Sequence, residues 1–163
     1  QMCIRDSDNL VVTGTFSKSR SLAGLRIGFA VANPELIAIL EAVKNSYNSY
    51  CVNSVSMLAG AASIADKDYF YETVAKVKAT REKTAAALRA LGFTVADSGT
   101  NFLFVTKDDS DMKAMFEYLK GKKVFIRYFD LPRIDNHVRI TVGTDEEMEI
   151  LLTHIRTFLS EQA

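Results

Sequence analysis

The sequence predicts an α/β fold in which helices cover small sheets, and two observations support this prediction. Short apolar runs that end at glycine, proline or polar residues alternate with longer segments whose apolar residues recur every three or four positions. From residue 54 onward the predicted order is helix, helix, strand, strand, helix, strand, strand, helix, which is an α+β layer with helices on a small sheet. A hydrophobic fraction of 48% is enough for a packed core.

The first part of the chain is predicted to contain two strands and a helix. Residues 9–14 and 26–32 are short apolar runs of the kind that forms strands. Asn33 can cap a helix, and Pro34 suits the first helical position. The segment 47–53 is polar and aromatic and is expected to be a loop. One face of the predicted helix carries Leu36, Ile37, Leu40 and Val43.

Two helices and two strands are predicted next. An Ala-rich helix begins at residue 54, and a second helix covers residues 69–91, where Gly92 provides a C-terminal stop. Residues 93–96 and 102–106 are expected to be strands on either side of a polar turn. This arrangement brings two strands of the small sheet next to each other in the chain.

The final part of the chain is predicted to contain two strands between two helices. Ser110 is expected to cap a helix that ends at Gly121, and residues 124–128 and 137–142 are expected to be strands. The Thr-x-x-Glu pattern at 144–147 is a capping box that begins the last helix. The residues that this helix is expected to bury are Met148, Leu151, Leu152, Ile155, Phe158 and Leu159.

Composition argues against several classes of function. Lys+Arg and Asp+Glu both number 20, so a broad electrostatic footprint for nucleic acid or an anionic membrane is not expected. No apolar run approaches the roughly 20 residues of a membrane span. Two cysteines and two histidines indicate neither a disulfide framework nor a metal site. Since no signal peptide is apparent, we expect a reducing, cytoplasmic setting.

The strongest candidate site is Thr-Phe-Ser-Lys-Ser-Arg-Ser-Leu-Ala-Gly-Leu-Arg-Ile-Gly at 15–28, where Lys18 follows Thr15 and Ser17. Imine formation needs a neutral amine, which a lysine provides when neighbouring cations or desolvation lower its pKa. A guanidinium such as Arg26, together with hydroxyl groups and backbone N–H groups, holds a phosphate. The alternative interpretation of this segment is a surface loop rich in Ser, Lys and Arg.

The segment resembles the cofactor-lysine segment of fold-type I enzymes that use pyridoxal 5′-phosphate (PLP). Within that group it is most similar to the histidinol-phosphate aminotransferase family. The resemblance implies that Lys18 forms a Schiff base with PLP. It also implies that Thr15, Ser17 and Arg26 hold the cofactor phosphate.

The resemblance runs from about residue 9 to the C-terminus and implies a domain organisation. Residues 1–7 have no counterpart and are interpreted as an unrelated N-terminal scar. Residues 8–53 are expected to be a remnant of a three-layer, PLP-binding large domain, and residues 54–163 a small C-terminal α+β domain. Because the family's chains are longer, we expect this sequence to be a C-terminal fragment that is inactive alone.

Three further residues are candidates for substrate binding by the same resemblance. Arg139, in Val-Arg-Ile-Thr-Val-Gly-Thr, resembles an arginine that binds the anionic end of the substrate. A cation between apolar strand residues is costly to bury unless an anion meets it, although the residue could also face solvent. Arg127 resembles an arginine that binds the substrate phosphate, and Arg133 competes for that role. Asn101 resembles an asparagine close to the substrate, and a turn-ending asparagine is the alternative.

These resemblances imply a PLP-dependent aminotransferase that exchanges an amino group between L-histidinol phosphate and 2-oxoglutarate in histidine biosynthesis. Lys18 would move a proton between the substrate α-carbon and the C4′ atom of the cofactor. The expected partners are the small-molecule amino donor, the 2-oxo acid and a second copy of the chain. Three alternatives stay open: a decarboxylase of threonine phosphate, an aromatic or aspartate aminotransferase, and a non-catalytic module that binds phosphate or mediates oligomerisation.

Overall fold

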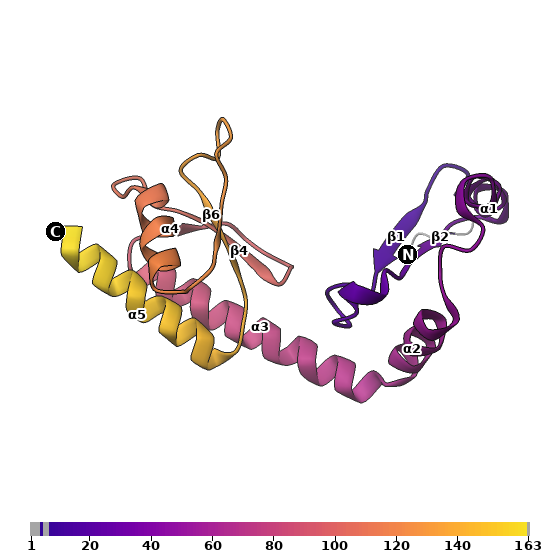
Figure 1. The fold of residues 1–163 in the computed structure, drawn as a ribbon, viewed down its shortest axis with the longest axis horizontal. Coiled ribbons are helices and arrows are strands. Elements are labelled where there is room, and N and C mark those ends of the chain that lie inside the picture. The colour runs from indigo at the N-terminus through magenta and orange to yellow at the C-terminus, as the bar shows by residue number, and fades with distance from the viewer. Residues whose placement is uncertain (1–3, 5–6, 163) are drawn as a thin grey trace. The chain divides into compact units, whose positions relative to one another are not determined.

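The computed structural model describes residue 4 and residues 7–162 of the chain (Figure 1). The chain divides into two compact units, Gln1–Glu72 and Thr73–Ala163. This boundary differs from the predicted domain boundary between residues 53 and 54. The helix α2, Ser54–Ala65, therefore belongs to the first unit rather than to the second. The assignment of residues to a large and a small domain stays a prediction.

The first unit contains an antiparallel pair of strands and the helices α1 and α2. β1, Val12–Thr15, pairs with β2, Gly28–Val31, and the register joins Val12 to Val31 and Thr15 to Gly28. A short 3₁₀ helix, η2, covers Ala23–Leu25 between the two strands. Both predicted strands are confirmed with changed bounds, since β1 begins later and ends one residue later than the predicted run at 9–14, and β2 lies within the run at 26–32.

The helix α1, Pro34–Asn48, begins as the sequence predicts. The side chain of Asn33 accepts a hydrogen bond from the backbone N–H of Leu36 at 2.9 Å, and Pro34 occupies the first turn. The helix continues to Asn48, so the expected loop at 47–53 begins later than predicted, because nothing in residues 44–48 breaks a helix. α1 has no buried residue, and Val43 on its apolar face is 62% exposed.

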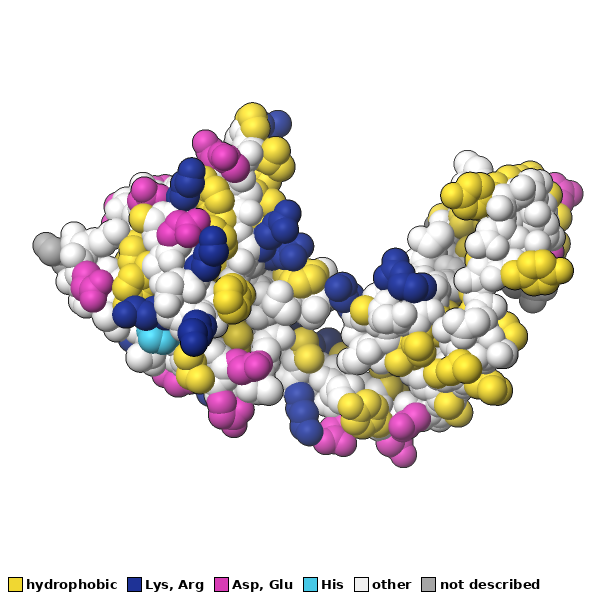
Figure 2. Space-filling view, viewed as in Figure 1, with side chains coloured by type: hydrophobic (Ala, Val, Ile, Leu, Met, Phe, Trp, Pro, Cys, Tyr) yellow, Lys and Arg dark blue, Asp and Glu magenta, His cyan; other side chains and the backbone are white. Residues whose placement is uncertain are grey.

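Apolar side chains are exposed over both helices of the first unit (Figure 2). On α2, Leu58 is 73% exposed, whereas Ser56 and Gly60 on the same helix are buried. The backbone of α2 therefore packs through its small residues and leaves its large apolar residues on the surface.

The second unit is built on a four-stranded antiparallel sheet with the order β3-β4-β6-β5. Its strands are β3 at Thr94–Val95, β4 at Phe102–Thr106, β5 at Arg127–Tyr128 and β6 at Val138–Thr141. The helices are α3 at Lys67–Ala90, α4 at Met112–Gly121 and α5 at Asp145–Gln162 (Figure 1). α3 begins in the first unit and continues into the second.

Alternation along β4 and β6 separates the core of the second unit from an open face. Leu103 and Val105 of β4, with Val138 and Ile140 of β6, are almost fully buried. They pack with residues of α3, α4 and α5 in one hydrophobic cluster. The residues between them point to the opposite face of the sheet because successive side chains in a strand alternate.

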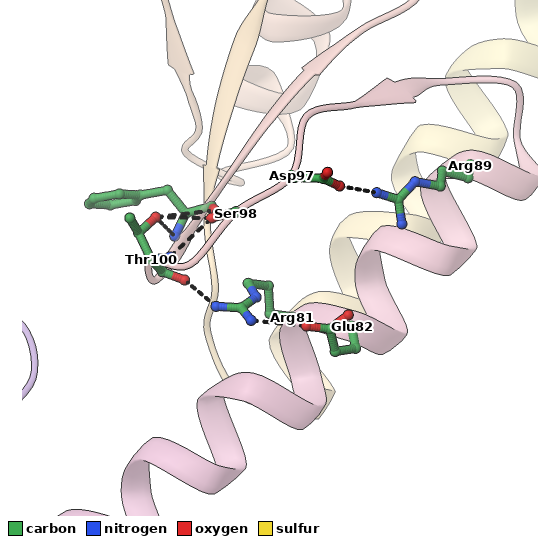
Figure 3. Close-up of polar contacts among 7 residues, drawn as sticks. Arg81, Glu82, Arg89, Asp97, Ser98 and Thr100 are labelled. Atoms are coloured by element: carbon green, nitrogen blue, oxygen red, sulfur yellow. Dashed lines mark hydrogen bonds and ion pairs between the residues drawn. The ribbon is translucent and has the colours of Figure 1, made fainter. Parts of the chain in front are cut away.

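The long helix α3 confirms the helix predicted at 69–91, with Gly92 at φ 85° after its end. Arg81 interrupts its apolar face, and the structure shows how it is accommodated (Figure 3). The guanidinium donates to the carbonyl oxygen of Thr100 at 2.9 Å and pairs with Glu82. Nearby, Arg89 and Asp97 form an ion pair at 3.7 Å (Figure 3). These contacts attach the β3–β4 turn to α3.

In the second unit, the predicted cap of α4 is wrong and one predicted strand is confirmed only in its last two residues. Asp111, not Ser110, caps α4, and its carboxylate accepts from the N–H groups of Lys113 at 2.9 Å and Ala114 at 3.0 Å. The strand predicted at 124–128 is reduced to β5 because Lys123 adopts φ 63°, which ends α4 in the left-handed conformation. In that geometry the N–H of Val124 donates to the carbonyl oxygen of Leu119.

The predicted start of α5 is confirmed. The N–H of Thr144 donates to Glu147 Oε2 at 2.9 Å, and the N–H of Glu147 donates to Thr144 Oγ1 at 3.2 Å, which is a capping box. Leu159 is partly buried, and the other five residues predicted to be inward are buried. Among the described residues, no helix is long and apolar enough to span a membrane.

Candidate functional site

Lys18 lies on a closed turn between β1 and β2 in the first unit. The N–H of Phe16 donates to the carbonyl oxygen of Ile27 at 3.1 Å and continues the strand pairing into the turn. The N–H of Leu22 donates to the carbonyl oxygen of Phe16 at 3.1 Å, and the N–H of Ser21 donates to the carbonyl oxygen of Lys18 at 3.1 Å. Lys18 is exposed at the bend of this turn.

The structure brings together the two hydroxyl residues predicted to hold a phosphate. Thr15 Oγ1 and Ser17 Oγ lie 2.9 Å apart, and Thr15 Oγ1 accepts from the N–H of Ser17 at 3.1 Å. Thr15 Oγ1 also lies 3.3 Å from the carbonyl oxygen of Ile27. Both hydroxyls therefore belong to one short hydrogen-bonded segment immediately before Lys18.

Arg26 closes the same turn on its far side. It adopts φ 56° and ψ 41°, in the left-handed region, and is the C-cap of η2. Its guanidinium is exposed and donates to the carbonyl oxygen of Ala23 at 3.2 Å. The left-handed conformation is uncommon for a residue other than glycine.

A pocket of about 550 Å³ lies beside the turn. Thr15, Phe16, Arg20, Phe29 and Phe70 are among the residues that line it, whereas Lys18 and Arg26 do not line it. The phenylalanine rings among them are those of Phe16, Phe29 and Phe70. Arg20 is the cationic residue among those that line this pocket, and sequence analysis gave it no role.

In the second unit, Arg127 and Arg139 are direct partners in the register of β5 and β6. Partnered residues of an antiparallel pair have their side chains on the same face of the sheet. Phe104 is the partner of Arg139 on the other side, in β4. Both arginines therefore belong to the open face of the sheet, opposite the core.

The open face combines cations with aromatic rings. The guanidinium carbon of Arg139 lies 4.3 Å from the centre of the Phe102 ring, and that of Arg127 lies 5.6 Å from the centre of the Phe129 ring. Arg139 Nε is buried and has no hydrogen-bond partner among the residues that the structure describes. A buried, unsatisfied N–H is costly, so this arrangement favours an anionic ligand.

The two remaining candidates for substrate binding, Arg133 and Asn101, lie elsewhere in the second unit. Arg133 lies on the loop between β5 and β6, is exposed and adopts φ 74°. Asn101 precedes β4 and is half-buried, and its carbonyl oxygen accepts from the N–H of Val142 at 2.9 Å. This contact holds the backbone of Asn101. The role of its side chain in substrate binding stays a prediction.

Residues 2–155 match the family described as aminotransferase class I and II. The chain belongs to this family. It is 48% identical over 149 residues to a histidinol-phosphate aminotransferase of Brachyspira hyodysenteriae, a match that covers 91% of the chain and 42% of the relative. The chain therefore spans less than half the length of this curated relative.

Solved aminotransferase structures confirm the predicted fold class. A histidinol-phosphate aminotransferase from Sinorhizobium meliloti, in complex with pyridoxal-5′-phosphate, matches with a TM-score of 0.84 and 28% identity over 98% of the chain and 44% of that structure. An L-threonine-O-3-phosphate decarboxylase from Porphyromonas gingivalis matches with a TM-score of 0.80 and 25% identity over 96% of the chain and 49% of that structure. The aminotransferase fold thus accommodates more than one reaction.

Among the described residues, no three His, Cys, Asp or Glu side chains gather in a way that could hold a metal ion. The guanidinium of Arg20 donates to the carbonyl oxygen of Ser63. Sequence analysis missed this contact because Ser63 is 43 residues away in the chain.

Proposed function

We propose that this protein is a PLP-dependent aminotransferase that exchanges an amino group between L-histidinol phosphate and 2-oxoglutarate, a step in histidine biosynthesis. The observation that carries the proposal is the closed turn that presents Lys18 immediately after two adjacent hydroxyl groups. The high identity to a histidinol-phosphate aminotransferase supports the choice of substrate.

The residues of the turn suit a phosphorylated aldehyde cofactor. The hydroxyls of Thr15 and Ser17 are 2.9 Å apart and can both donate to one phosphate, and Arg26 supplies a cation on the same turn. The amine of Lys18 is the nucleophile that this type of cofactor requires. PLP, when bound, accepts the electron pair that is released at the substrate α-carbon.

In this proposal Lys18 acts as general base and then as general acid. Its amine removes the proton from the substrate α-carbon and delivers it to the C4′ atom of the cofactor. Thr15, Ser17 and Arg26 hold the phosphate end in place so that the reacting atoms stay close to the amine.

Arg127 and Arg139 would orient the substrate through its phosphate or carboxylate. Two cations at directly opposed positions of a sheet repel each other, and an anion between them removes that repulsion. The unsatisfied Nε–H of Arg139 offers a donor for this anion. Asn101, next to Phe102, is a third proposed contact to the substrate.

We also propose that the protein is a cytoplasmic homodimer. The support for a dimer is the apolar surface of α1 and α2, since exposed apolar residues over two neighbouring helices are typical of a surface that another protein surface covers (Figure 2). The two cysteines of the sequence, too few for a disulfide framework, are consistent with a reducing compartment.

The proposal is tested by trapping the cofactor on the product of the complete gene. Borohydride reduction in the presence of PLP should fix the cofactor covalently to Lys18, which mass spectrometry of peptides would locate. Lys18→Ala should abolish the adduct and the visible absorption, and turnover should collapse. An adduct on a different lysine would show that the assignment is wrong.

A threonine-phosphate decarboxylase is the second candidate, supported by the match to such an enzyme. Incubation with L-threonine O-3-phosphate should release no carbon dioxide if the aminotransferase proposal is correct. Amino transfer from L-histidinol phosphate to 2-oxoglutarate, measured as glutamate formation, should be the fastest reaction in a screen of amine donors.

A further inference from the structure

Arg20 connects the turn that carries Lys18, residues 16–27, to α2 and to the first turns of α3. Its guanidinium donates to the carbonyl oxygen of Ser63 near the end of α2, and lies 3.5 Å from Ser63 Oγ. Its guanidinium carbon is 4.2 Å from the centre of the Phe70 ring in the first turns of α3. The ring of Phe16, within the turn itself, is 5.8 Å away. One side chain thus joins three segments.

The turn that Arg20 belongs to contains an unusual backbone conformation. Ser21, the next residue, has φ 55°, and Arg26 has φ 56°. Residues with a side chain seldom adopt this left-handed region, and they keep it only when surrounding contacts hold them there. Lys18 is on the same turn, three residues before Ser21, so contacts that hold this conformation also fix the backbone that carries its amine.

α2 provides a close support for the base of the turn. A Cβ atom at Gly60 would lie 3.0 Å from Ile27 Cδ1 and 3.5 Å from the ring of Phe16, so the helix backbone and the turn are in tight contact. Ser56, one helical turn earlier, is also buried. This apolar contact holds the two ends of the turn, whereas its tip is held by the polar contact of Arg20.

We infer that Arg20 is a positioning residue that holds the Lys18 turn against α2 and the start of α3, and so directs the Lys18 amine. The inference rests on the proposed function for the role of Lys18. The contact of Arg20 itself can be tested without any cofactor. Arg20 needs its planar guanidinium for this role, because it donates to a carbonyl oxygen and stacks on an aromatic ring at the same time.

The first experiment measures hydrogen exchange of the product of the complete gene without PLP. In Arg20→Met, which keeps the apolar stem, amides of residues 16–25 should exchange about tenfold faster or more, because a charge-assisted contact is lost. Amides of Phe102–Thr106 should not change. Arg156→Met is the matched control, since Arg156 pairs with Glu149 on the exposed surface of α5.

A second substitution separates positioning from a general loss of stability. Ser21→Gly, added to Arg20→Met, removes the cost of the left-handed residue and should restore part of the protection of residues 16–25. The rate at which borohydride reduction fixes PLP on Lys18 should fall about tenfold in Arg20→Met. In the double variant this rate should recover in part.

Unchanged exchange at residues 16–25 in Arg20→Met would overturn the inference, as would trapping on Lys18 at the wild-type rate. If Arg20→Met unfolds the whole chain, Phe70→Leu replaces it, since this variant keeps an apolar side chain but removes the stacking ring. Faster exchange of 16–25 in Phe70→Leu supports the inference, and no change overturns it. Failure of the wild type to trap PLP on Lys18, with exchange altered as expected, would instead contradict the proposed function.

Discussion

Two arginines that sequence reasoning assigned to different ligands lie in different units of the structure. Arg26 belongs to the Lys18 turn of the first unit, and Arg139 to the open sheet face of the second. Their surroundings differ in kind. Arg26 is exposed and contacts a backbone carbonyl of its own turn. Arg139 is half-buried over an aromatic ring, and its Nε–H has no partner in the part of the chain that the structure describes.

This difference predicts separate effects for the two substitutions in the product of the complete gene. Arg26→Ala should weaken PLP binding about tenfold or more, because a charge-assisted phosphate contact contributes roughly 1.5–3 kcal/mol. Arg139→Ala should leave PLP bound and raise the KM for the anionic substrate. Titration with PLP and steady-state kinetics would measure both effects. If both variants lost cofactor equally and kept the same KM, the assignment of Arg26 to the cofactor and Arg139 to the substrate would be wrong.

A surface carboxylate should contribute a small pH dependence to stability. The hydrogen bond from Lys107 Nζ to Asp109 Oδ1, at 2.6 Å, lowers the pKa of Asp109 below its usual value. Because the folded pKa is the lower one, the contact stabilises the fold above about pH 4 and is lost as the pH falls through the folded pKa.

Acid unfolding measured by circular dichroism should show this contribution. Asp109→Asn should reduce stability at neutral pH slightly and flatten the loss below about pH 4. Asp130→Asn, at an exposed carboxylate on the loop between β5 and β6, is the matched control. A curve for Asp109→Asn as steep as that of the wild type would contradict the contact.

At the scale of elements, the N-termini of α5 and α4 show when the local sequence is enough to predict the capping residue. Thr144 and Glu147 form the predicted capping box because both partners lie within one helical turn. At α4, two adjacent residues could each act as the cap. Asp111 is the cap and Ser110 is buried with its hydroxyl unsatisfied, because the chain enters the helix one residue later than its pattern indicates.

The start of α4 therefore predicts a pair of opposite outcomes in urea unfolding. Asp111→Ala should lower the free energy of unfolding by about 1 kcal/mol, since two N–H groups lose their acceptor. Ser110→Ala should have little effect or raise the free energy of unfolding, because it removes a buried hydroxyl that has no partner among the described residues. A larger loss in the free energy of unfolding for Ser110→Ala than for Asp111→Ala would show that Ser110 is the capping residue.

At the scale of the whole molecule, the two units differ in how much core they contain. The buried hydrophobic cluster of the chain lies in residues from Ala85 onward, whereas the helix α1 of the first unit buries none of its residues. A unit with few buried apolar contacts opens locally more often than one with a packed core. The structure therefore assigns most of the stability of this chain to the second unit.

Limited proteolysis of the 163-residue chain should reveal this difference. The first cleavages are expected within residues 7–72, and a fragment that contains Thr73–Ala163 should persist. Mass spectrometry of the early products would locate the cuts. Early cleavage within Phe102–Thr106 or α5 would show that the second unit is not the more stable one.

The sequence by itself determined the elements whose pattern is local. Strand β4 coincides with the predicted run at 102–106, and five of the six inward residues predicted for α5 are buried, because side-chain alternation and helical periodicity depend only on neighbouring residues. The Lys18 segment was singled out by its resemblance to a cofactor-lysine segment, which can be read in the sequence because the hydroxyl groups, the lysine and the arginine lie within one short stretch.

Only the tertiary structure decided which distant residues meet. The cross-strand pairing of Arg127 with Arg139 depends on the register of β5 and β6. The contact of Arg20 with Ser63 and Phe70 depends on the packing of α2 and α3 beside the Lys18 turn. Neither the register nor the packing leaves a periodic signal in the sequence, because each results from the fit between segments that are far apart in the chain.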